Sequence, residues 1–173
     1  MMMLTRSTQT RPNRVLAFDP GYERLGVAVL ERDGAKEKLI YCDCVRTTAS
    51  LSFTERLGII GEAAEKLIEE FKPDAVAIEE VYFEKNAKTA TKVARVVGAL
   101  SYIAMRAGLP LFEYTPLEVK VAVTGYGKSD KAAVSMMVQK LVIIPAKKRL
   151  DDEMDAIAIG ITCLAASSAN RAL

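Results

Sequence analysis

The order of apolar segments constrains the fold of this chain more than any other feature. Short apolar runs predict strands at 15–18, 25–30, 38–45, 75–78 and 110–114. The first three runs are joined by short, turn-rich links, which predicts an antiparallel meander. Apolar residues at helical spacing then predict long helices at 52–71 and 87–107, on either side of the fourth strand. Three strands followed by alternating helices and strands indicate one mixed α/β sheet of five strands with helices packed on its faces.

The C-terminal third of the sequence predicts three more helices, at 116–123, 131–142 and 152–167. Ser129 is the expected N-cap of the middle one, and Pro145 follows its end. A length of 173 residues is typical of a single domain. We therefore predict a disordered N-terminal extension over 1–13 and one domain over 14–173.

Targeting and membrane segments are not expected in this sequence. The longest mostly apolar stretch, 156–169, is shorter than the roughly 18 to 20 apolar residues that a membrane span needs. The polar start of the chain has no apolar region of the kind found in secretory signals. We expect a cytoplasmic protein with no membrane association.

The absence of histidine excludes several kinds of catalytic site. Without imidazole there is no Ser-His-Asp or Cys-His triad and no His-ligated zinc. The three cysteines, Cys42, Cys44 and Cys163, are odd in number and lack C-x-x-C spacing, so we expect reduced structural thiols. Catalysis by this chain would have to depend on carboxylates, lysines, hydroxyls or a bound metal.

Charge is unevenly distributed along the sequence. The segment 81–150 holds 12 Lys and Arg against 4 Asp and Glu, a net of +8; the chain's +2 less this +8 leaves −6 for the remainder. A basic segment in an otherwise acidic chain favours a polyanionic partner. The alternative is a set of solvated helix faces.

Acidic residues follow or begin several of the predicted elements. Asp19 ends the first strand, Glu79 ends the fourth, and Asp152 and Asp155 share one face at the start of the last helix. If the first and fourth strands are neighbours, Asp19 and Glu79 meet at their carboxyl ends, where α/β sheets bind ligands. Such a cluster would need cations to stay ionised, which indicates a Mg²⁺ site able to support phosphodiester hydrolysis through two ions.

Each acid also has a purely structural interpretation. Asp19 precedes Pro-Gly and can be a turn residue. Asp151, Asp152 and Glu153 can cap the last helix and favour its positive end. Glu79 is harder to explain in this way, because a carboxylate directly after an apolar strand is costly unless it is paired.

With these acids in this order, the chain resembles the RuvC family of Holliday junction resolvases, which have the ribonuclease H-like fold. The resemblance covers about 14–165, and its most specific piece is PDAVAIEEVYFEKNAKTA at 73–90. Two further pieces are FEYTPLEVKVAVTGYGKSDKAAV at 112–134 and DDEMDAIAI at 151–159, whereas FDPGYERLG at 18–26 is less specific.

The resemblance implies roles for individual residues. The implied metal-binding catalytic carboxylates are Asp19, Glu79, Asp152 and Asp155, with Asp151 as a neighbouring rival for the third position. Basic residues implied to contact DNA are Lys85, Lys120, Lys128 and Lys131, and Lys131 is also implied to stabilise charge in the transition state. Tyr82 takes the place of an aromatic residue that the family uses near the crossover.

The implied activity is that of a structure-selective, Mg²⁺-dependent endodeoxyribonuclease of recombination and repair, with two ions in each site and Mn²⁺ as a substitute. It would act as a homodimer that nicks two strands of a four-way junction symmetrically, together with the RuvA and RuvB branch-migration proteins. The apolar stripe of the 87–107 helix is a candidate dimer seam, and core packing explains the same stripe.

Other functions remain open on the sequence alone. The same fold permits a nuclease acting on RNA or RNA–DNA hybrids, or an inactive scaffold that binds junctions without cutting them. An actin-like or sugar-kinase ATPase is a weaker alternative, because such proteins need two comparable domains around the nucleotide.

Overall fold

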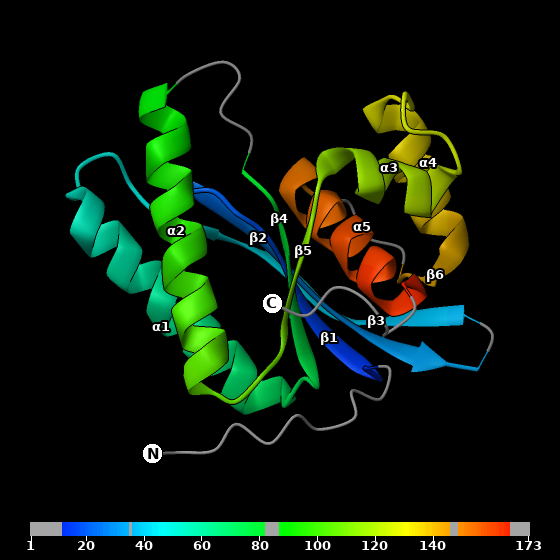
Figure 1. The fold of residues 1–173 in the computed structure, drawn as a ribbon, viewed down its shortest axis with the longest axis horizontal. Coiled ribbons are helices and arrows are strands. Elements are labelled where there is room, and N and C mark those ends of the chain that lie inside the picture. The colour runs from blue at the N-terminus through cyan, green and yellow to red at the C-terminus, as the bar shows by residue number, and fades with distance from the viewer. Residues whose placement is uncertain (1–11, 35, 82–86, 146–148, 167–173) are drawn as a thin grey trace.

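The sheet has six strands in the order β5-β4-β1-β2-β3-β6 (Figure 1). The structure is a computed structural model that describes residues 12–34, 36–81, 87–145 and 149–166. The strands are β1 (Arg14–Asp19), β2 (Arg24–Asp33), β3 (Lys36–Arg46), β4 (Ala75–Glu79), β5 (Leu111–Tyr114) and β6 (Val142–Ile143). β1, β2 and β3 pair antiparallel, and β4 and β5 extend the sheet in parallel from β1, so the predicted mixed sheet is confirmed.

The prediction of five strands was wrong by one. Val142 and Ile143 pair in parallel with Glu37 and Lys38 at the outer edge of β3. The two residues directly follow helix α4 (Lys131–Leu141) within one apolar run, so the sequence pattern attached them to that helix. Helices are predicted from spacing over many residues, and a two-residue strand leaves no signal of its own.

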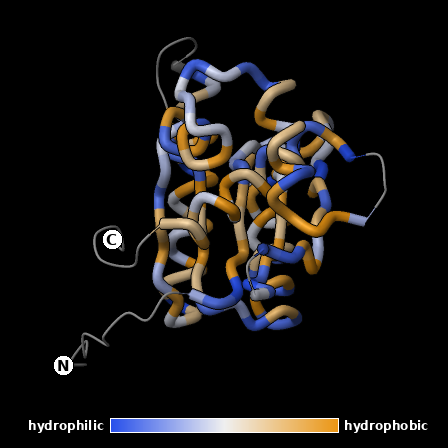
Figure 2. Tube along the Cα trace, turned by 90° about the vertical axis from the view of Figure 1, so that its right-hand side faces the viewer, coloured by the Kyte–Doolittle hydropathy of each residue, from blue (hydrophilic) through white to orange (hydrophobic). Residues whose placement is uncertain are grey.

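Helices cover both faces of the sheet (Figure 1). α1 (Phe53–Phe71) and α2 (Ala87–Arg106) lie side by side on one face. α5 (Asp151–Ala165) packs on the other, with α3 (Pro116–Thr124) and α4 against it. Two cores result, one on each side of the central strands, and Figure 2 shows hydrophobic segments running through the middle of the fold.

Alternation along β1 divides its side chains between the two cores. Leu16 and Phe18 face α1 and α2, whereas Val15 and Ala17 face α5. α5 comes close to the sheet at Gly160, where a Cβ would lie 2.5 Å from Cδ1 of Leu30. The position of α5 over β1 and β2 is therefore fixed by close packing.

Local signals set most helix ends. Ser52 and Glu55 form a reciprocal capping box at the start of α1, and Thr115 and Glu118 form another at α3. The expected cap of α4 was wrong by one residue: the carboxylate of Asp130, not the hydroxyl of Ser129, accepts the backbone N–H of Ala133 at 2.8 Å. Both residue types cap helices well, so the sequence did not separate two adjacent candidates.

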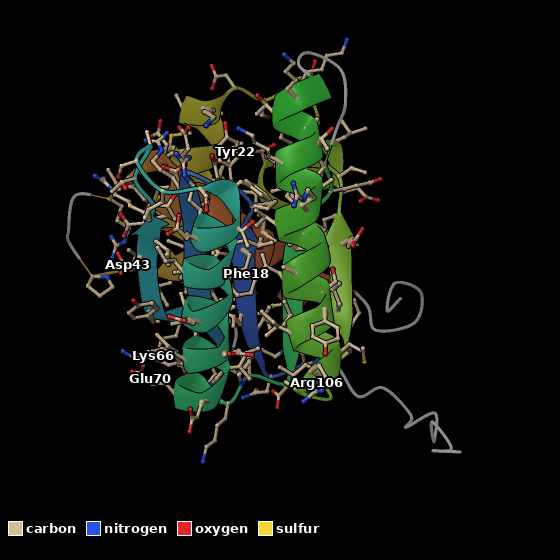
Figure 3. All side chains as sticks on the ribbon, turned by 90° about the vertical axis from the view of Figure 1, so that its left-hand side faces the viewer. Phe18, Tyr22, Asp43, Lys66, Glu70 and Arg106 are labelled. Carbon is tan, nitrogen blue, oxygen red and sulfur yellow. The ribbon has the colours of Figure 1, made fainter. Side chains whose placement is uncertain are left out.

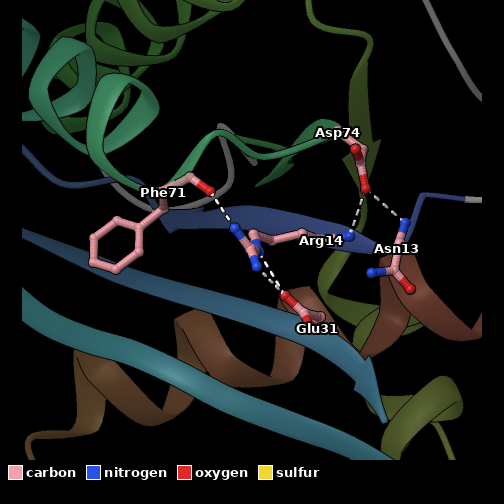
Figure 4. Close-up of polar contacts among 5 residues, drawn as sticks. All are labelled: Asn13, Arg14, Glu31, Phe71 and Asp74. Atoms are coloured by element: carbon pink, nitrogen blue, oxygen red, sulfur yellow. Dashed lines mark hydrogen bonds and ion pairs between the residues drawn. The ribbon is translucent and has the colours of Figure 1, made fainter. Parts of the chain in front are cut away.

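Polar contacts hold the start of β1 in place (Figure 4). The carboxylate of Asp74 accepts the backbone N–H groups of Asn13 and Arg14 at 2.9 and 2.8 Å. Arg14 donates to the carbonyl of Phe71 at 2.7 Å and pairs with Glu31. The structure thus gives fixed partners to Asn13, which lies in the predicted 1–13 extension, while residues 1–11 lie outside its described part.

The cysteines are free thiols in the structure, as predicted. Cys44 and Cys163 are buried, and Cys42 is half-buried. The thiol of Cys42 accepts a hydrogen bond from Nε of Arg149 at 3.2 Å and lies 3.4 Å from Oε1 of Glu153. Cys42 and Cys44 lie on β3 and Cys163 lies in α5, so the three thiols help to pack α5 against the sheet.

Candidate active site

Two neighbouring strands end in carboxylates at the same edge of the sheet. β1 and β4 are adjacent and parallel, with Phe18 opposite Ile78, so Asp19 and Glu79 each follow that pair by one residue. Both carboxylates continue the alternating set that faces α5, because Ala17 and Ala77 belong to the core on that side. The sequence predicted that Asp19 and Glu79 would meet only if their strands were neighbours, and β1 and β4 are neighbours.

α5 brings the other two predicted carboxylates to this edge. It begins where β1 and β4 end (Figure 1), and Asp152 and Asp155 lie in its first turns. The close approach depends on Gly26, the residue opposite Asp19 on β2. A Cβ at Gly26 would lie 2.1 Å from the carbonyl oxygen of Asp152 and 3.2 Å from Cβ of Asp19.

The charges of the predicted carboxylates influence one another. Burial, followed by the charges of Glu79, Asp155 and Asp152, raises the pKa of Asp19 to about 7. Burial and the charge of Asp155 raise the pKa of Glu79 to about 7 as well. Ordinary surface carboxylates titrate about three units lower, so burial, helped by the neighbouring carboxylates, disfavours the charged forms of Asp19 and Glu79.

Basic side chains offset part of that charge. Nζ of Lys131, at the start of α4, donates to Oδ2 of Asp155 at 3.0 Å. The charges of Lys131 and Lys120 oppose the rise in the pKa of Glu79, which places both near the predicted cluster. Lys128 is exposed in the segment between α3 and α4. Tyr82 and Lys85 lie outside the described residues.

Of the two adjacent acids, Asp152 rather than Asp151 influences the pKa of Asp19. The charge of Asp152 acts on Asp19, whereas Asp151 is exposed and is not among the groups that shift the pKa of Asp19 or Glu79. The helix-capping role considered for these acids is filled by Glu153, which is buried and accepts the backbone N–H of Leu150 at 2.7 Å. Asp152 does not make this capping bond, although it remains one of three first-turn acids that favour the positive end of α5.

Arg24 is a site residue that the sequence prediction missed. Its Nε lies 3.4 Å from Oδ2 of Asp152, a buried oxygen that accepts no hydrogen bond within the described residues. Arg24 begins β2 and faces Asp152 only because the sheet and α5 meet there. Nothing in its local sequence signals this contact.

The donor set fits a hard divalent cation. The four predicted carboxylates carry oxygen donors, the type that such a cation prefers; Asp19 and Glu79 have raised pKa values, and one buried oxygen of Asp152 lacks a hydrogen bond. Across the described ranges no group of three or more acidic or thiol side chains is already drawn together as an ion would require. Two of the four carboxylates are instead paired with cations, Asp152 with Arg24 and Asp155 with Lys131.

The raised pKa of Asp19 predicts a pH-dependent cost to folding. When the pKa of a carboxyl is higher in the folded than in the unfolded state, the free energy of unfolding of the protein falls as pH rises between the two pKa values, here between about 4 and 7. In EDTA, we expect Asp19→Asn to gain stability relative to the parent as pH rises from 5 to 8, by on the order of 3 kcal/mol. Urea unfolding of both proteins at the two pH values measures this gain. A difference between them that does not change with pH would contradict it.

The fold and the site together define a class. A mixed sheet of this order, with carboxylates from two adjoining strand ends facing the start of a helix, makes this an α/β protein of ribonuclease H-like fold with an acidic site suited to divalent cations. The family model described as crossover junction endodeoxyribonuclease RuvC matches residues 15–163. The chain belongs to the RuvC family.

Two relatives illustrate the similarity. The crossover junction endodeoxyribonuclease RuvC of Ruminiclostridium cellulolyticum is 40% identical over 147 residues, covering 85% of this chain and 89% of the relative. The protein of the same name from Thermosipho melanesiensis is 41% identical over 152 residues, covering 88% and 96%. The matches cover most of both this chain and the relatives.

Solved structures agree with this assignment. T. thermophilus RuvC in complex with a Holliday junction substrate superposes with a TM-score of 0.81 at 34% identity, covering 86% of this chain and 91% of that one. The yeast mitochondrial Holliday junction resolvase, with a TM-score of 0.66 at 12% identity, shares the fold. In the part of the chain that the structure describes, no helix is both long and apolar enough to cross a membrane.

Proposed function

We propose that this chain resolves four-way DNA junctions by paired symmetric nicks, in homologous recombination and DNA repair. The observation that carries the proposal is that Asp19 and Glu79 end adjacent strands at the edge of the sheet where α5, which carries Asp152 and Asp155, begins, in a chain of the RuvC family. A relative solved with a Holliday junction substrate supports a junction as the DNA ligand.

The four carboxylates are the proposed ligands of divalent cations, which members of this family need. Two Mg²⁺ ions in each site, replaceable by Mn²⁺, would supply an activated water and neutralise charge on the leaving oxygen. Asp19 and Glu79 hold fixed positions because each ends a central strand. Asp152 and Asp155 are aligned against them by the close contact of α5 with Gly26.

Lys131 is the proposed electrostatic partner of the reacting phosphate. Its ammonium already lies beside Asp155, with the side chain 73% exposed, so it can also face a phosphate in the site. A positioned cation lowers the barrier most when it faces charge that develops in the transition state.

Replacing Lys131 with Ala is expected to lower the cleavage rate by about 10- to 100-fold and to change junction affinity by less than about threefold. Single-turnover cleavage and equilibrium binding separate the two effects. Lys140→Ala is the matched control, because Lys140 is an exposed lysine in the last turn of the same helix. A loss in affinity alone would make Lys131 a phosphate-positioning residue.

DNA contacts are proposed at the basic residues beside the site. Lys120 lies near Glu79, and Lys128 is exposed in the next turn, so both are placed to meet phosphates of a bound strand. Lys85 is proposed as a further phosphate contact, and Tyr82 as a base-stacking residue at the crossover. Most of the affinity should come from phosphates and should fall with salt.

Paired nicks require two sites, so we propose a homodimer in which a two-fold axis relates them. Val96, Leu100 and Ala104 of the apolar stripe of α2 are buried in the core of the chain itself, so these three residues are not part of a seam. A seam formed by other residues of α2, which include the exposed Tyr102 and Met105, stays a prediction. The proposed cellular partners are the RuvA and RuvB branch-migration proteins.

A plasmid cruciform tests the paired mechanism. Two nicks within one bound complex convert the supercoiled plasmid directly to a linear form. A single nick relaxes the plasmid, which removes the cruciform and stops the reaction at a nicked circle. We expect linear product without accumulation of nicked circles; nicked circles alone would contradict the paired mechanism.

A further inference from the structure

A cluster of aromatic and basic side chains lies at the same end of the sheet as the acidic site, on the opposite face from α5. Tyr22 follows β1 in the chain, and Phe53 begins α1; their rings pack edge to face with centroids 6.1 Å apart. Figure 3 shows Tyr22 beside the upper ends of α1 and α2, with Lys66 and Arg106 near the opposite ends. We call Tyr22, Phe53, Lys92 and Arg95 the Tyr22 patch.

Two cations from α2 lie over these rings. Nζ of Lys92 is 4.8 Å from the centroid of Tyr22, and Cζ of Arg95 is 4.4 Å from that of Phe53. Lys92 and Arg95 are exposed, and neither pairs with a carboxylate among the described residues. The rings hold these side chains in place while leaving their charges open to a ligand.

A third cation differs in this respect. Cζ of Arg56 lies 5.8 Å from the centroid of Tyr22, but Arg56 is buried. Its guanidinium donates to the carbonyl of Leu51 at 3.2 Å and pairs with Glu23 at 3.7 Å. The charge of Arg56 is therefore satisfied within the protein, and Arg56 supports the Tyr22 patch from inside. The charges of Lys92 and Arg95 have no such carboxylate partner among the described residues.

The loop that carries Tyr22 is firmly held. The hydroxyl of Thr47 donates to the carbonyl of Tyr22 at 2.6 Å, and the backbone N–H of Thr47 donates to the carbonyl of Glu23 at 3.0 Å. At Gly21 a Cβ would lie 2.2 Å from the carbonyl oxygen of Arg24, so the turn is tight. Since Tyr22 is three residues from Asp19, the patch has a fixed position relative to the acidic site.

A DNA strand with one phosphate in the acidic site must leave it in two directions. Lys120, Lys128 and Lys131 meet it on the side of α3 and α4. On the side of α1 and α2, the Tyr22 patch offers two open cations beside the strand ends. We propose that Lys92 and Arg95, oriented by Tyr22 and Phe53, bind backbone phosphates of the junction as it leaves the site on this side. The inference rests on the proposed function and extends its DNA-binding surface.

The test is junction binding by Lys92→Gln/Arg95→Gln in an Asp19→Asn background, which prevents cutting during the measurement. We expect about a tenfold or greater loss of affinity near 0.1 M salt, and a slope of log affinity against log salt that falls by roughly 0.9 for each lost phosphate contact. Lys92→Arg/Arg95→Lys should restore most of the slope, because it keeps both charges over the rings.

The matched control is Lys66→Gln/Arg106→Gln. It removes the same charge from α1 and α2 at their opposite ends, and Arg106 likewise lies over a ring, 6.0 Å from the centroid of Tyr102. We expect its affinity and salt slope to match those of the parent.

The outcomes distinguish the patch from the proposed function. A parent that neither binds nor cuts four-way junctions would overturn the proposed function itself. A parent that does both, with patch and control variants that bind equally well, would overturn only the role of the patch. Sedimentation of each variant covers the remaining case: loss of the dimer with an unchanged salt slope would identify a subunit contact and would also overturn DNA binding by the patch.

Discussion

Replacing Asp19 with Asn is expected to abolish junction cleavage, with a rate loss of at least about 10³-fold, while junction binding stays within several-fold of the parent. The substitution keeps the size of the side chain but removes a charge from the centre of the coupled cluster, where burial and three other carboxylates already raise the pKa of Asp19 to about 7. We expect the charge of Asp19 to be needed for binding divalent cations and not for folding. Single-turnover cleavage of a labelled junction, beside a binding assay, measures both effects.

Two adjacent acids at the start of α5 provide the matched comparison. Asp152→Asn should also abolish cleavage, because the charge of Asp152 helps to raise the pKa of Asp19 and because Asp152 has a buried oxygen without a hydrogen bond. Asp151→Asn should retain activity within about threefold, because Asp151 is exposed outside the cluster. A reversal, with Asp151 essential and Asp152 dispensable, would contradict the assignment of the third carboxylate.

The second large effect is expected at Gly26, which has no ionisable group. In Gly26→Ala the new methyl group would meet the backbone of Asp152 at 2.1 Å and Cβ of Asp19 at 3.2 Å. Because the nearest atoms belong to the backbone of Asp152, the first turn of α5 must move away from β2, the strand that carries Gly26. We expect at least about a 100-fold loss of cleavage, since a displacement near 1 Å at reacting groups has that effect. Overpacking should also lower stability by roughly 1–3 kcal/mol.

Gly98→Ala is the control for Gly26→Ala. Gly98 lies in α2, where a Cβ meets no atom within 4 Å, so the substitution should be neutral or slightly stabilising. Circular dichroism and urea unfolding show whether Gly26→Ala remains folded. A Gly26→Ala protein that is folded and cuts at the parent rate would contradict the close-packing argument; a folded protein that has lost the Mg²⁺-dependent rise in its melting temperature would support it.

The sequence predicted much of this site because its acids sit at element boundaries. Asp19 and Glu79 follow short apolar runs that form β1 and β4, and Asp152 and Asp155 share a helical face, so secondary structure alone limited where they lie. That β1 and β4 are neighbours is a fact of tertiary structure, which the local pattern left conditional.

Features that depend on contacts between distant segments could not be predicted in this way. Arg24 reads as a turn residue until α5 is placed opposite it, and Gly26 reads as one more strand residue until the backbone of Asp152 is found against it. The stripe of α2 fitted a dimer seam in sequence and fitted a core somewhat better, and the structure shows Val96 and Leu100 buried within the chain. β6 has too few residues to leave any periodicity.

The most direct test of the central claim is cleavage of end-labelled mobile four-way junctions, linear duplex and RNA–DNA hybrid, each with and without Mg²⁺. We expect nicks confined to the junction, at symmetric positions on two strands of like polarity, and only when the metal is present. Cutting of the hybrid alone would indicate a ribonuclease instead. Tight junction binding without cutting, with Mg²⁺ or Mn²⁺ present, would contradict the nuclease assignment and leave a junction-binding scaffold.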